Sequence, residues 1–372
     1  MSGGASSPAA AGAGPGRPAA SPGGPHPSAR PAGGALPSAR GSGHRHDHLR
    51  TGGRARAGWS APRPVDPGRA LIALSCPAPG DCVALDSAGA ALVERASRWS
   101  EPVPGIALPV SAPSPGYLSC PSVGWCLAVH SADEVISWSA AGEPAPGWGP
   151  PVALGGAQGL QAVGCASPSA CVAIDGVGDG YVLQGSTWSS QENAWGGATD
   201  IACPGPTRCV ATMGGVSTWD GEDWSLPVDA DPGGMLSAVS CAGTAFCVAT
   251  DPAGREVTWR GAGWSAPLVI SGGPAPRSGP AGDGGAAAAL FGVSCPAPTF
   301  CLATGAGGRA IRWDGGAWSA PMTAATGTSL AAVSCPISTW CAAADTRGDV
   351  VTYTSRRPES HRRAHASRRS GE

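Results

Sequence analysis

Residues 290–321 read LFGVSCPAPTFCLATGAGGRAIRWDGGAWSAP, and this stretch decides the fold. It divides into short extended runs at 291–295, 301–304 and 309–313, and a fourth run begins at Trp318. The segments GAGG and DGG between the later runs suit tight hairpins, because glycine readily adopts positive φ. Consecutive short strands without helical periodicity are typical of one blade of a β-propeller.

The same unit recurs along the chain, and its clearest mark is a pair of cysteines separated by five residues. The steps between successive pairs are 44, 45, 38, 38, 54 and 40 residues, which matches the length of one propeller blade. All 14 cysteines belong to these pairs. The pairs are Cys76 and Cys82, Cys120 and Cys126, Cys165 and Cys171, Cys203 and Cys209, Cys241 and Cys247, Cys295 and Cys301, and Cys335 and Cys341.

A second mark, Trp followed by Ser or Gly and usually by a nearby Pro, identifies the fourth run of each unit. It lies at Trp59, Trp99, Trp148, Trp188, Trp224, Trp264 and Trp318, which matches the seven cysteine pairs. The first of these tryptophans, Trp59, precedes the first cysteine pair, whereas the last cysteine unit ends near Tyr353 without such a mark. A closed ring explains the offset if residues 59–62 supply the outer strand of the blade formed by 330–354. The sequence therefore predicts an all-β, seven-bladed β-propeller of four-stranded blades over residues 57–354, closed by an N-terminal strand.

The segments on either side of this domain have a different composition. Residues 1–56 are almost entirely Gly, Pro, Ala, Ser, His and Arg, and residues 355–372 are rich in Arg. Such segments bury too little apolar surface to offset the entropy of folding, so we expect two disordered basic tails. Arginine-rich tails can touch nucleic acid through charge alone. They lack the aromatic residues that stack on bases, so we do not expect a nucleic-acid partner.

The cysteine pairs favour structural disulfides over zinc. Two cysteines that flank a short loop can face each other across a hairpin at bonding distance, whereas a zinc site would need pairing between blades. Disulfides indicate an oxidising compartment, so we expect an extracellular or cell-surface location. Residues 1–30 contain no apolar run typical of a secretory signal, a conflict that a different start or a non-standard export route would resolve. No apolar stretch is long enough to span a membrane.

Two sets of residues are candidates for a ligand-binding rim. The first set ends the second run of its unit and either forms turns or faces a ligand: Asp86, His130, Asp175, Asp251 and Asp345. The second set precedes the second cysteine and either stacks on sugars or is buried under loops: Trp125, Phe246, Phe300 and Trp340.

The repeat SCPxxxxC, with a Gly turn, a Trp and WSxP after it, resembles the secreted and surface β-propellers of actinobacteria that are grouped with sialidase-like and YVTN/BNR repeat proteins. Residues 218–224, TWDGEDW, are similar to the Asp-box of sialidases but one residue shorter. The resemblance implies a propeller fold and is unspecific for activity. Sialidase chemistry would need a Tyr nucleophile paired with Glu, and the chain has only three tyrosines.

These observations predict a non-catalytic, extracellular or cell-surface propeller, a monomer that binds a glycan or a protein. The alternatives are a sialidase-like glycoside hydrolase and the sensor domain of a signalling system. We expect no catalytic residues, metal or cofactor, because the sequence has no Walker A, dinucleotide-binding or H-E-x-x-H motif.

Overall fold

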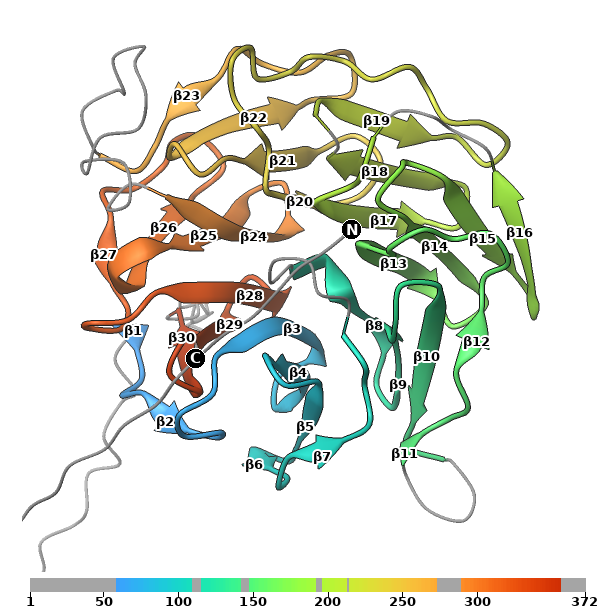
Figure 1. Cartoon of the computed structure of the whole chain (residues 1–372). Coiled ribbons are helices and arrows are strands. Elements are labelled where there is room, and N and C mark those ends of the chain that lie inside the picture. Colours follow the sequence, from blue (N-terminus) through green and yellow to red (C-terminus); the bar gives the residue numbers. More distant parts are fainter. Residues whose placement is uncertain are drawn as a thin grey trace, which may run out of the picture. The chain divides into compact units, whose positions relative to one another are not determined.

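The computed structural model describes residues 58–108, 115–141, 147–191, 196–212, 214–272 and 289–355. The described residues form seven antiparallel sheets arranged around a ring (Figure 1), so the predicted seven-bladed propeller is confirmed. The innermost strand of each blade contacts the innermost strands of the blades before and after it, which closes the circle. The predicted tail at 1–56, and all but Ser355 of the predicted tail at 355–372, lie outside the described residues.

The first three blades follow one another from residue 71 onward. Blade 1 consists of β3 (Leu71–Ala78), β4 (Asp81–Asp86), β5 (Ala90–Arg95), β6 (Arg98–Trp99) and β7 (Val103–Pro104). Blade 2 consists of β8 (Leu118–Ser122), β9 (Trp125–Val129), β10 (Glu134–Ser139), β11 (Gly147–Trp148) and β12 (Val152–Ala153), preceded by the 3₁₀ turn η1 (Pro115–Tyr117). Blade 3 consists of β13 (Ala162–Ser167), β14 (Ala170–Ile174), β15 (Gly180–Gln184) and β16 (Thr187–Gln191).

The remaining blades complete the ring. Blade 4 consists of β17 (Asp200–Gly205), β18 (Arg208–Thr212) and β19 (Val216–Trp219), with its outer strand reduced to isolated bridges. Blade 5 consists of β20 (Ala238–Cys241), β21 (Cys247–Thr250), β22 (Arg255–Trp259) and β23 (Leu268–Val269). Blade 6 consists of β24 (Leu290–Ala297), β25 (Phe300–Gly305), β26 (Arg309–Trp313) and β27 (Met322–Thr323), with the 3₁₀ turn η2 (Ala306–Gly308). Blade 7 consists of β28 (Leu330–Ile337), β29 (Trp340–Asp345), β30 (Asp349–Thr354), β1 (Gly58–Trp59) and β2 (Arg63–Pro64).

Blade 7 combines the two ends of the described chain. Strands β1 and β2 both pair with β30, with Trp59 opposite Tyr353 and Arg63 opposite Val350. The predicted closure by an N-terminal strand is therefore confirmed. Since outer strands are interrupted in the same way in blades 1 and 2, β1 and β2 together form one outer strand of ordinary type.

In five blades, the serine of the Trp-Ser mark bonds the outer strand to the third strand of its blade. Its hydroxyl accepts a hydrogen bond from a backbone N–H of the third strand, as in Thr352 N to Ser60 Oγ at 2.9 Å and Thr258 N to Ser265 Oγ at 3.0 Å. The same hydroxyl donates to the next carbonyl, as in Ser60 Oγ to Ala61 O at 3.0 Å. The serine hydroxyl thus supplies an acceptor for a backbone N–H of the third strand. It does so just before a proline, which has no N–H with which to continue the backbone pairing.

The serine before the first cysteine joins neighbouring blades. Its hydroxyl accepts from the backbone N–H of the first cysteine in the next blade, as in Cys120 N to Ser75 Oγ at 3.0 Å and Cys76 N to Ser334 Oγ at 2.9 Å. The same bond occurs after blades 2, 5 and 6. We call these five bonds the serine latch. The equivalent residues in blades 3 and 4 are Gly164 and Ala202, which have no hydroxyl to make it.

The cysteines form seven disulfides inside blades, each between the first and second strand, with Cα atoms 4.0–4.1 Å apart. The pairing agrees with the sequence prediction, and the chain has no free cysteine. On the chain-entropy model, a bridge across so short a loop stabilises the fold by about 2 kcal/mol. The bonds join Cys76 with Cys82, Cys120 with Cys126, Cys165 with Cys171, Cys203 with Cys209, Cys241 with Cys247, Cys295 with Cys301, and Cys335 with Cys341.

The two cysteines of a pair differ in their surroundings. The second cysteine opens the buried part of the second strand and is at most 2% exposed in every blade: Cys82, Cys126, Cys171, Cys209, Cys247, Cys301 and Cys341. The first cysteine lies nearer the surface, as Cys165 does at 9% exposed. The bridges therefore connect the end of each first strand to the core of its own blade, and they belong to the scaffold.

Candidate functional site

The aspartates of the first candidate set are buried in turns. Asp86, Asp175, Asp251 and Asp345 are at most 1% exposed. One oxygen of each carboxylate accepts backbone N–H groups of its own turn, as in Ala90 N to Asp86 Oδ1 at 2.7 Å and Asp349 N to Asp345 Oδ1 at 2.9 Å. The carboxylates of Asp175 and Asp251 do the same. Each of these side chains shapes the hairpin between the second and third strands of its blade.

The second oxygen of two of these carboxylates binds an arginine. Arg255 donates through Nε to Asp251 at 2.7 Å and through Nη2 to Asp231 at 3.0 Å. Asp231 lies in the segment that enters blade 5, and burial together with the charge of Asp251 raises its pKa to about 6. In blade 1, Arg69 Nη1 lies 3.3 Å from Asp86 Oδ2. These contacts join the segment that precedes the first strand of a blade to the hairpin between the second and third strands of the same blade.

His130 occupies the equivalent position in blade 2, as the repeat predicted. Its Nδ1 accepts a long hydrogen bond of 3.4 Å from Ala107 N, and its Nε2 lies 3.9 Å from the Glu134 carboxylate.

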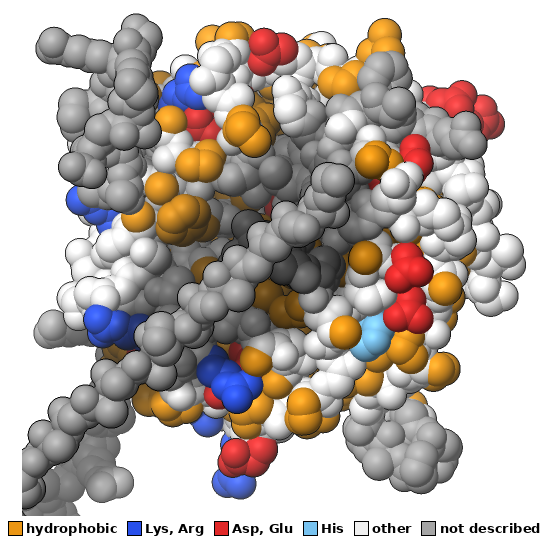
Figure 2. All heavy atoms as spheres, viewed as in Figure 1, with side chains coloured by type: hydrophobic (Ala, Val, Ile, Leu, Met, Phe, Trp, Pro, Cys, Tyr) orange, Lys and Arg blue, Asp and Glu red, His pale blue; other side chains and the backbone are white. Residues whose placement is uncertain are grey.

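Figure 2 shows the described charged side chains scattered over one face of the propeller, without a continuous basic stripe.

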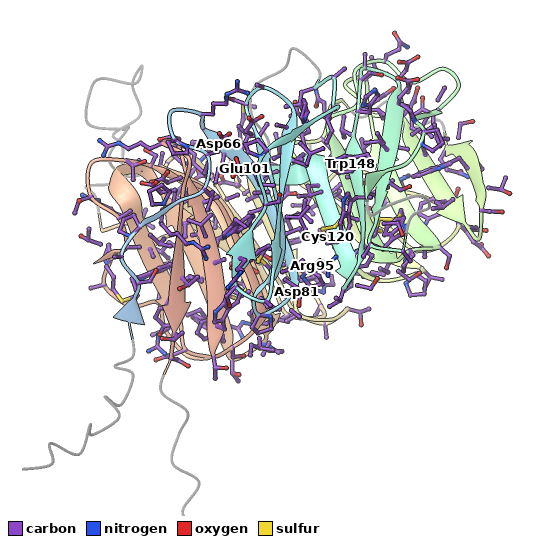
Figure 3. All side chains as sticks on the ribbon, turned by 90° about the horizontal axis from the view of Figure 1, so that it is seen from below. Asp66, Asp81, Arg95, Glu101, Cys120 and Trp148 are labelled. Atoms are coloured by element: carbon purple, nitrogen blue, oxygen red, sulfur yellow. A yellow bond between two sulfur atoms is a disulfide. The ribbon has the colours of Figure 1, made fainter. Side chains whose placement is uncertain are left out.

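An ion pair lies at one face of blade 1. Figure 3 shows Asp81 and Arg95 on that face, and Asp66, in the connection from β2 to β3, on the other face. Arg95 Nη1 donates to Asp81 Oδ1 at 3.0 Å, and its guanidinium carbon lies 4.9 Å from the centre of the Trp138 ring in blade 2. This ion pair lies over the seam between the two blades and contributes to their packing.

The second candidate set does not form one open aromatic surface. Phe246 and Phe300 are each 5% exposed and belong to two different parts of the core. Trp125 and Trp340 are half-buried and pack against two further core clusters. The structure therefore places these four rings beside four separate blade seams.

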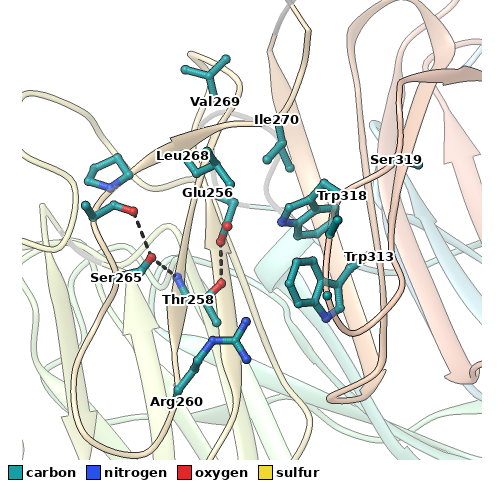
Figure 4. A pocket seen from close by; sticks show the side chains of 14 residues that line it. Glu256, Thr258, Arg260, Ser265, Leu268, Val269, Ile270, Trp313, Trp318 and Ser319 are labelled. Atoms are coloured by element: carbon teal, nitrogen blue, oxygen red, sulfur yellow. Dashed lines mark hydrogen bonds between the residues drawn. The ribbon is translucent and has the colours of Figure 1, made fainter.

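A hollow lined by a buried charged group lies elsewhere, between blades 5 and 6. It has a volume of about 760 Å³ (Figure 4). Glu256, Thr258, Arg260 and residues 265–270 line it from blade 5, and Trp313 and residues 316–319 line it from blade 6. We call this hollow the 5/6 groove. Its rim includes the exposed apolar side chains of Leu268 (53% exposed) and Val269 (37% exposed).

Glu256 is the unusual residue of the 5/6 groove. The residue is 5% exposed, and its carboxylate accepts a hydrogen bond of 2.7 Å from Thr258 Oγ1. Within the described part of the chain, no ion pair to this carboxylate is found under 4.0 Å. The strand registers place small or apolar residues at this position in every other blade: Ala91, Val135, Gly180, Val216, Ala310 and Val350.

The surroundings of Glu256 act on its pKa in opposite directions. Burial raises the pKa, while the Thr258 hydroxyl, the Trp318 indole and the charge of Arg260 lower it, and the net change is upward. Within the described part of the chain, the buried Trp318 indole N–H has no hydrogen-bond partner. The Arg260 guanidinium lies 5.5 Å from the centre of the Trp313 ring and 5.6 Å from that of Phe246.

Glu256 was not among the candidates predicted from the sequence, although the repeat contains the necessary signal. Aligning the third strands places one carboxylate among six small or apolar residues, at a position that faces the next blade. Buried carboxylates are costly unless they are paired, so such an outlier identifies a candidate site.

Among the described residues, no group of three or more His, Cys, Asp or Glu is placed to hold a metal ion. No helix in the described part of the chain is long and apolar enough to span a membrane.

No family model matches the chain, and no curated protein matches it. Solved structures do match. YCF48 bound to D1 peptide is 13% identical with a TM-score of 0.59, and the match covers 80% of this chain and 97% of that one. YCF48 from Cyanidioschyzon merolae is 15% identical with a TM-score of 0.55, covering 80% and 99%. The RRP9 WD40 repeats are 10% identical with a TM-score of 0.64, covering 81% and 99%. At these identities the likeness shows the propeller fold.

Proposed function

We propose that this chain is a non-catalytic binding propeller that holds a protein segment in the 5/6 groove. The observation that carries the proposal is the groove itself, about 760 Å³ in volume and lined by Trp318, Glu256 and the exposed Leu268. Apolar and aromatic walls with a few directed polar groups are typical of binding sites. One of the propellers that this chain resembles was solved with a bound peptide, which supports the choice of a peptide-like partner.

A protein partner fits the groove better than a glycan. Sugar binding relies on flat, accessible aromatic faces, and the four aromatic residues considered for that role lie at separate seams, two of them almost fully buried. The 5/6 groove instead offers the short outer strand β23, whose two residues are exposed. An extended peptide can pair with such an edge and place alternate side chains in the groove.

A hydrolase of the sialidase type is a weaker candidate. All three tyrosines of the chain, Tyr117, Tyr181 and Tyr353, are at most 7% exposed. For Tyr181, burial raises the pKa to about 12, which opposes the formation of a nucleophilic phenolate. These features favour binding without catalysis.

The location that we propose is extracellular or at the cell surface. Seven disulfides inside blades are stable in an oxidising compartment and rare in the cytosol. Alkylation of freshly isolated protein under denaturing conditions, with the alkylated cysteines counted by mass spectrometry, tests this assignment. Full protection of the cysteines supports it, and stoichiometric free thiols contradict it.

Selection from a displayed library of random linear peptides tests the binding function, with the full, oxidised chain as the target and a glycan array in parallel. We expect enriched peptides that lose binding in Leu268→Asp and keep it in Leu226→Asp, an equally apolar and 67% exposed residue of blade 4 outside the groove. Glycan signals without peptide enrichment, or equal peptide binding by both variants, would contradict the proposal.

A further inference from the structure

The 5/6 groove contains a negative charge that the described part of the chain does not neutralise. Glu256 is 5% exposed, and its carboxylate accepts a hydrogen bond from the neutral hydroxyl of Thr258. The cationic side chain that lines the groove is Arg260, which lies over the Phe246 and Trp313 rings instead of forming an ion pair with Glu256. A carboxylate in such a setting gains most from a cation brought in from outside.

The aromatic wall of the groove is suited to the same kind of group. Trp318 is half-buried beside the carboxylate, and its ring centre lies 5.7 Å from that of Trp313. Figure 4 shows Glu256, Trp318 and Ile270 gathered at one end of the groove, with Arg260 toward the other end. A cationic side chain lying on an indole face and reaching a carboxylate is a recurrent mode of recognition.

We infer that the 5/6 groove recognises a basic side chain, arginine or lysine, carried by an extended segment of a partner protein, with Glu256 as its counter-ion and Trp318 as its aromatic wall. This inference rests on the proposed binding function and names the chemical class of its ligand. The apolar rim formed by Leu268 and Val269 would cover the aliphatic part of such a side chain. Arg260 would disfavour a second cation at the opposite end of the groove.

The test uses capped single amino acids, so that it does not depend on selecting a peptide first. Nα-acetyl-arginine N-methylamide is compared with its citrulline counterpart, which has nearly the same shape and no charge, and lysine is compared with norleucine in the same way. The readout is the indole N–H resonance of Trp318 in the full, oxidised chain, assigned by its loss in Trp318→Phe. We expect the charged probes to shift this resonance and the neutral probes to leave it in place.

Variants at the carboxylate complete the experiment. Glu256→Gln is expected to weaken binding of the charged probes by about tenfold or more, as when a charge-assisted hydrogen bond is lost. Glu256→Val, which introduces the residue found in blades 2, 4 and 7, should do the same in a blade packed like its neighbours. Glu101→Gln removes an equal charge from an exposed position in blade 1 and should leave binding unchanged.

Each outcome decides between the two proposals. Equal shifts by arginine and citrulline, or probe binding that Glu256→Gln leaves intact, would overturn the counter-ion role while peptide selection could still succeed. Failure of the peptide library together with a charge-dependent Trp318 shift would contradict the protein-binding function and leave the cation site standing.

Discussion

Trp59 and Tyr353 lie directly opposite each other in the pair formed by β1 and β30, with ring centres 5.5 Å apart. They are separated by almost the whole length of the domain in sequence, so this contact exists only when the ring is closed. Other blades make the equivalent contact inside one hairpin, as Trp313 and Trp318 do at 5.7 Å. Closure thus reuses a contact that the repeat already provides.

Deleting residues 57–64 should therefore lower the melting temperature far more than deleting residues 1–50. The first truncation removes the outer strand of blade 7 and exposes the edge of β30, whereas the second leaves every described contact in place. Differential scanning calorimetry of the two oxidised proteins measures the difference. Equal melting temperatures would show that the ring is stable without its closing strand.

The serine latch gives a prediction in both directions. Ser334→Ala should destabilise the fold by about 1 kcal/mol, because Cys76 N loses its acceptor at the seam between blades 7 and 1. Ala202→Ser should stabilise it by a similar amount, about 1 kcal/mol, by supplying the hydroxyl missing between blades 4 and 5. Denaturant unfolding of both variants provides the measurement. A stabilising Ser334→Ala would rule out the latch.

The free energy of unfolding should depend on pH because of Asp200. Its carboxylate accepts from Ile201 N and, across the blade seam, from Val239 N, and burial raises its pKa from 3.8 to about 7. The folded state binds the Asp200 proton more tightly than the unfolded state does. Asp200 therefore makes its full contribution to stability below about pH 4. That contribution, on the order of a few kcal/mol, is lost as pH rises to about 7.

Asp200→Asn tests this assignment, since an amide does not titrate. The variant loses one hydrogen bond at every pH. The test is therefore how its stability relative to the wild type changes with pH. The difference in unfolding free energy between the wild type and the variant should shrink as pH rises from 4 to 7. A difference independent of pH would show that Asp200 ionises normally.

Glu256→Val should raise the melting temperature if Glu256 is present for binding and not for stability. Val135, Val216 and Val350 fill the same position without a buried charge, and replacing a buried carboxylate by a well-packed apolar side chain is often neutral or stabilising. Thermal melts at neutral pH compare the variant with Glu101→Gln. A marked loss of stability would instead assign Glu256 to the scaffold.

The fold could be predicted from the sequence because the same residues recur at the same positions in each blade. Cysteine spacing, glycine turns and the Trp-Ser mark all depend on contacts inside one blade, and the offset of Trp59 indicated the closure. The turn aspartates show the limit of this reasoning. Asp86 and Asp251 were candidates both for turns and for a ligand rim, and only the folded loops show both oxygens engaged in protein contacts.

The 5/6 groove was harder to predict, because it arises from the packing of one blade against the next. Each blade has an outer tryptophan or its equivalent, yet the neighbouring surface decides how it packs. In the seam between blades 3 and 4, Trp224 is 9% exposed and lies against Gly180, where an added Cβ would approach its indole nitrogen to 2.8 Å. At the equivalent place in blade 5, Glu256 faces Trp318, and the hollow remains open.

The closing pair also determines how the molecule would respond to mechanical load. Gly58 is opposite Thr354 at the very end of the antiparallel pair, with Trp59 opposite Tyr353 next to it. Tension between these two ends would act on one residue pair at a time and peel β1 away, instead of shearing the whole strand at once. The closing strand would detach at low force while the disulfides keep each blade's inner hairpin intact, so a force trace should begin with one small, reversible step.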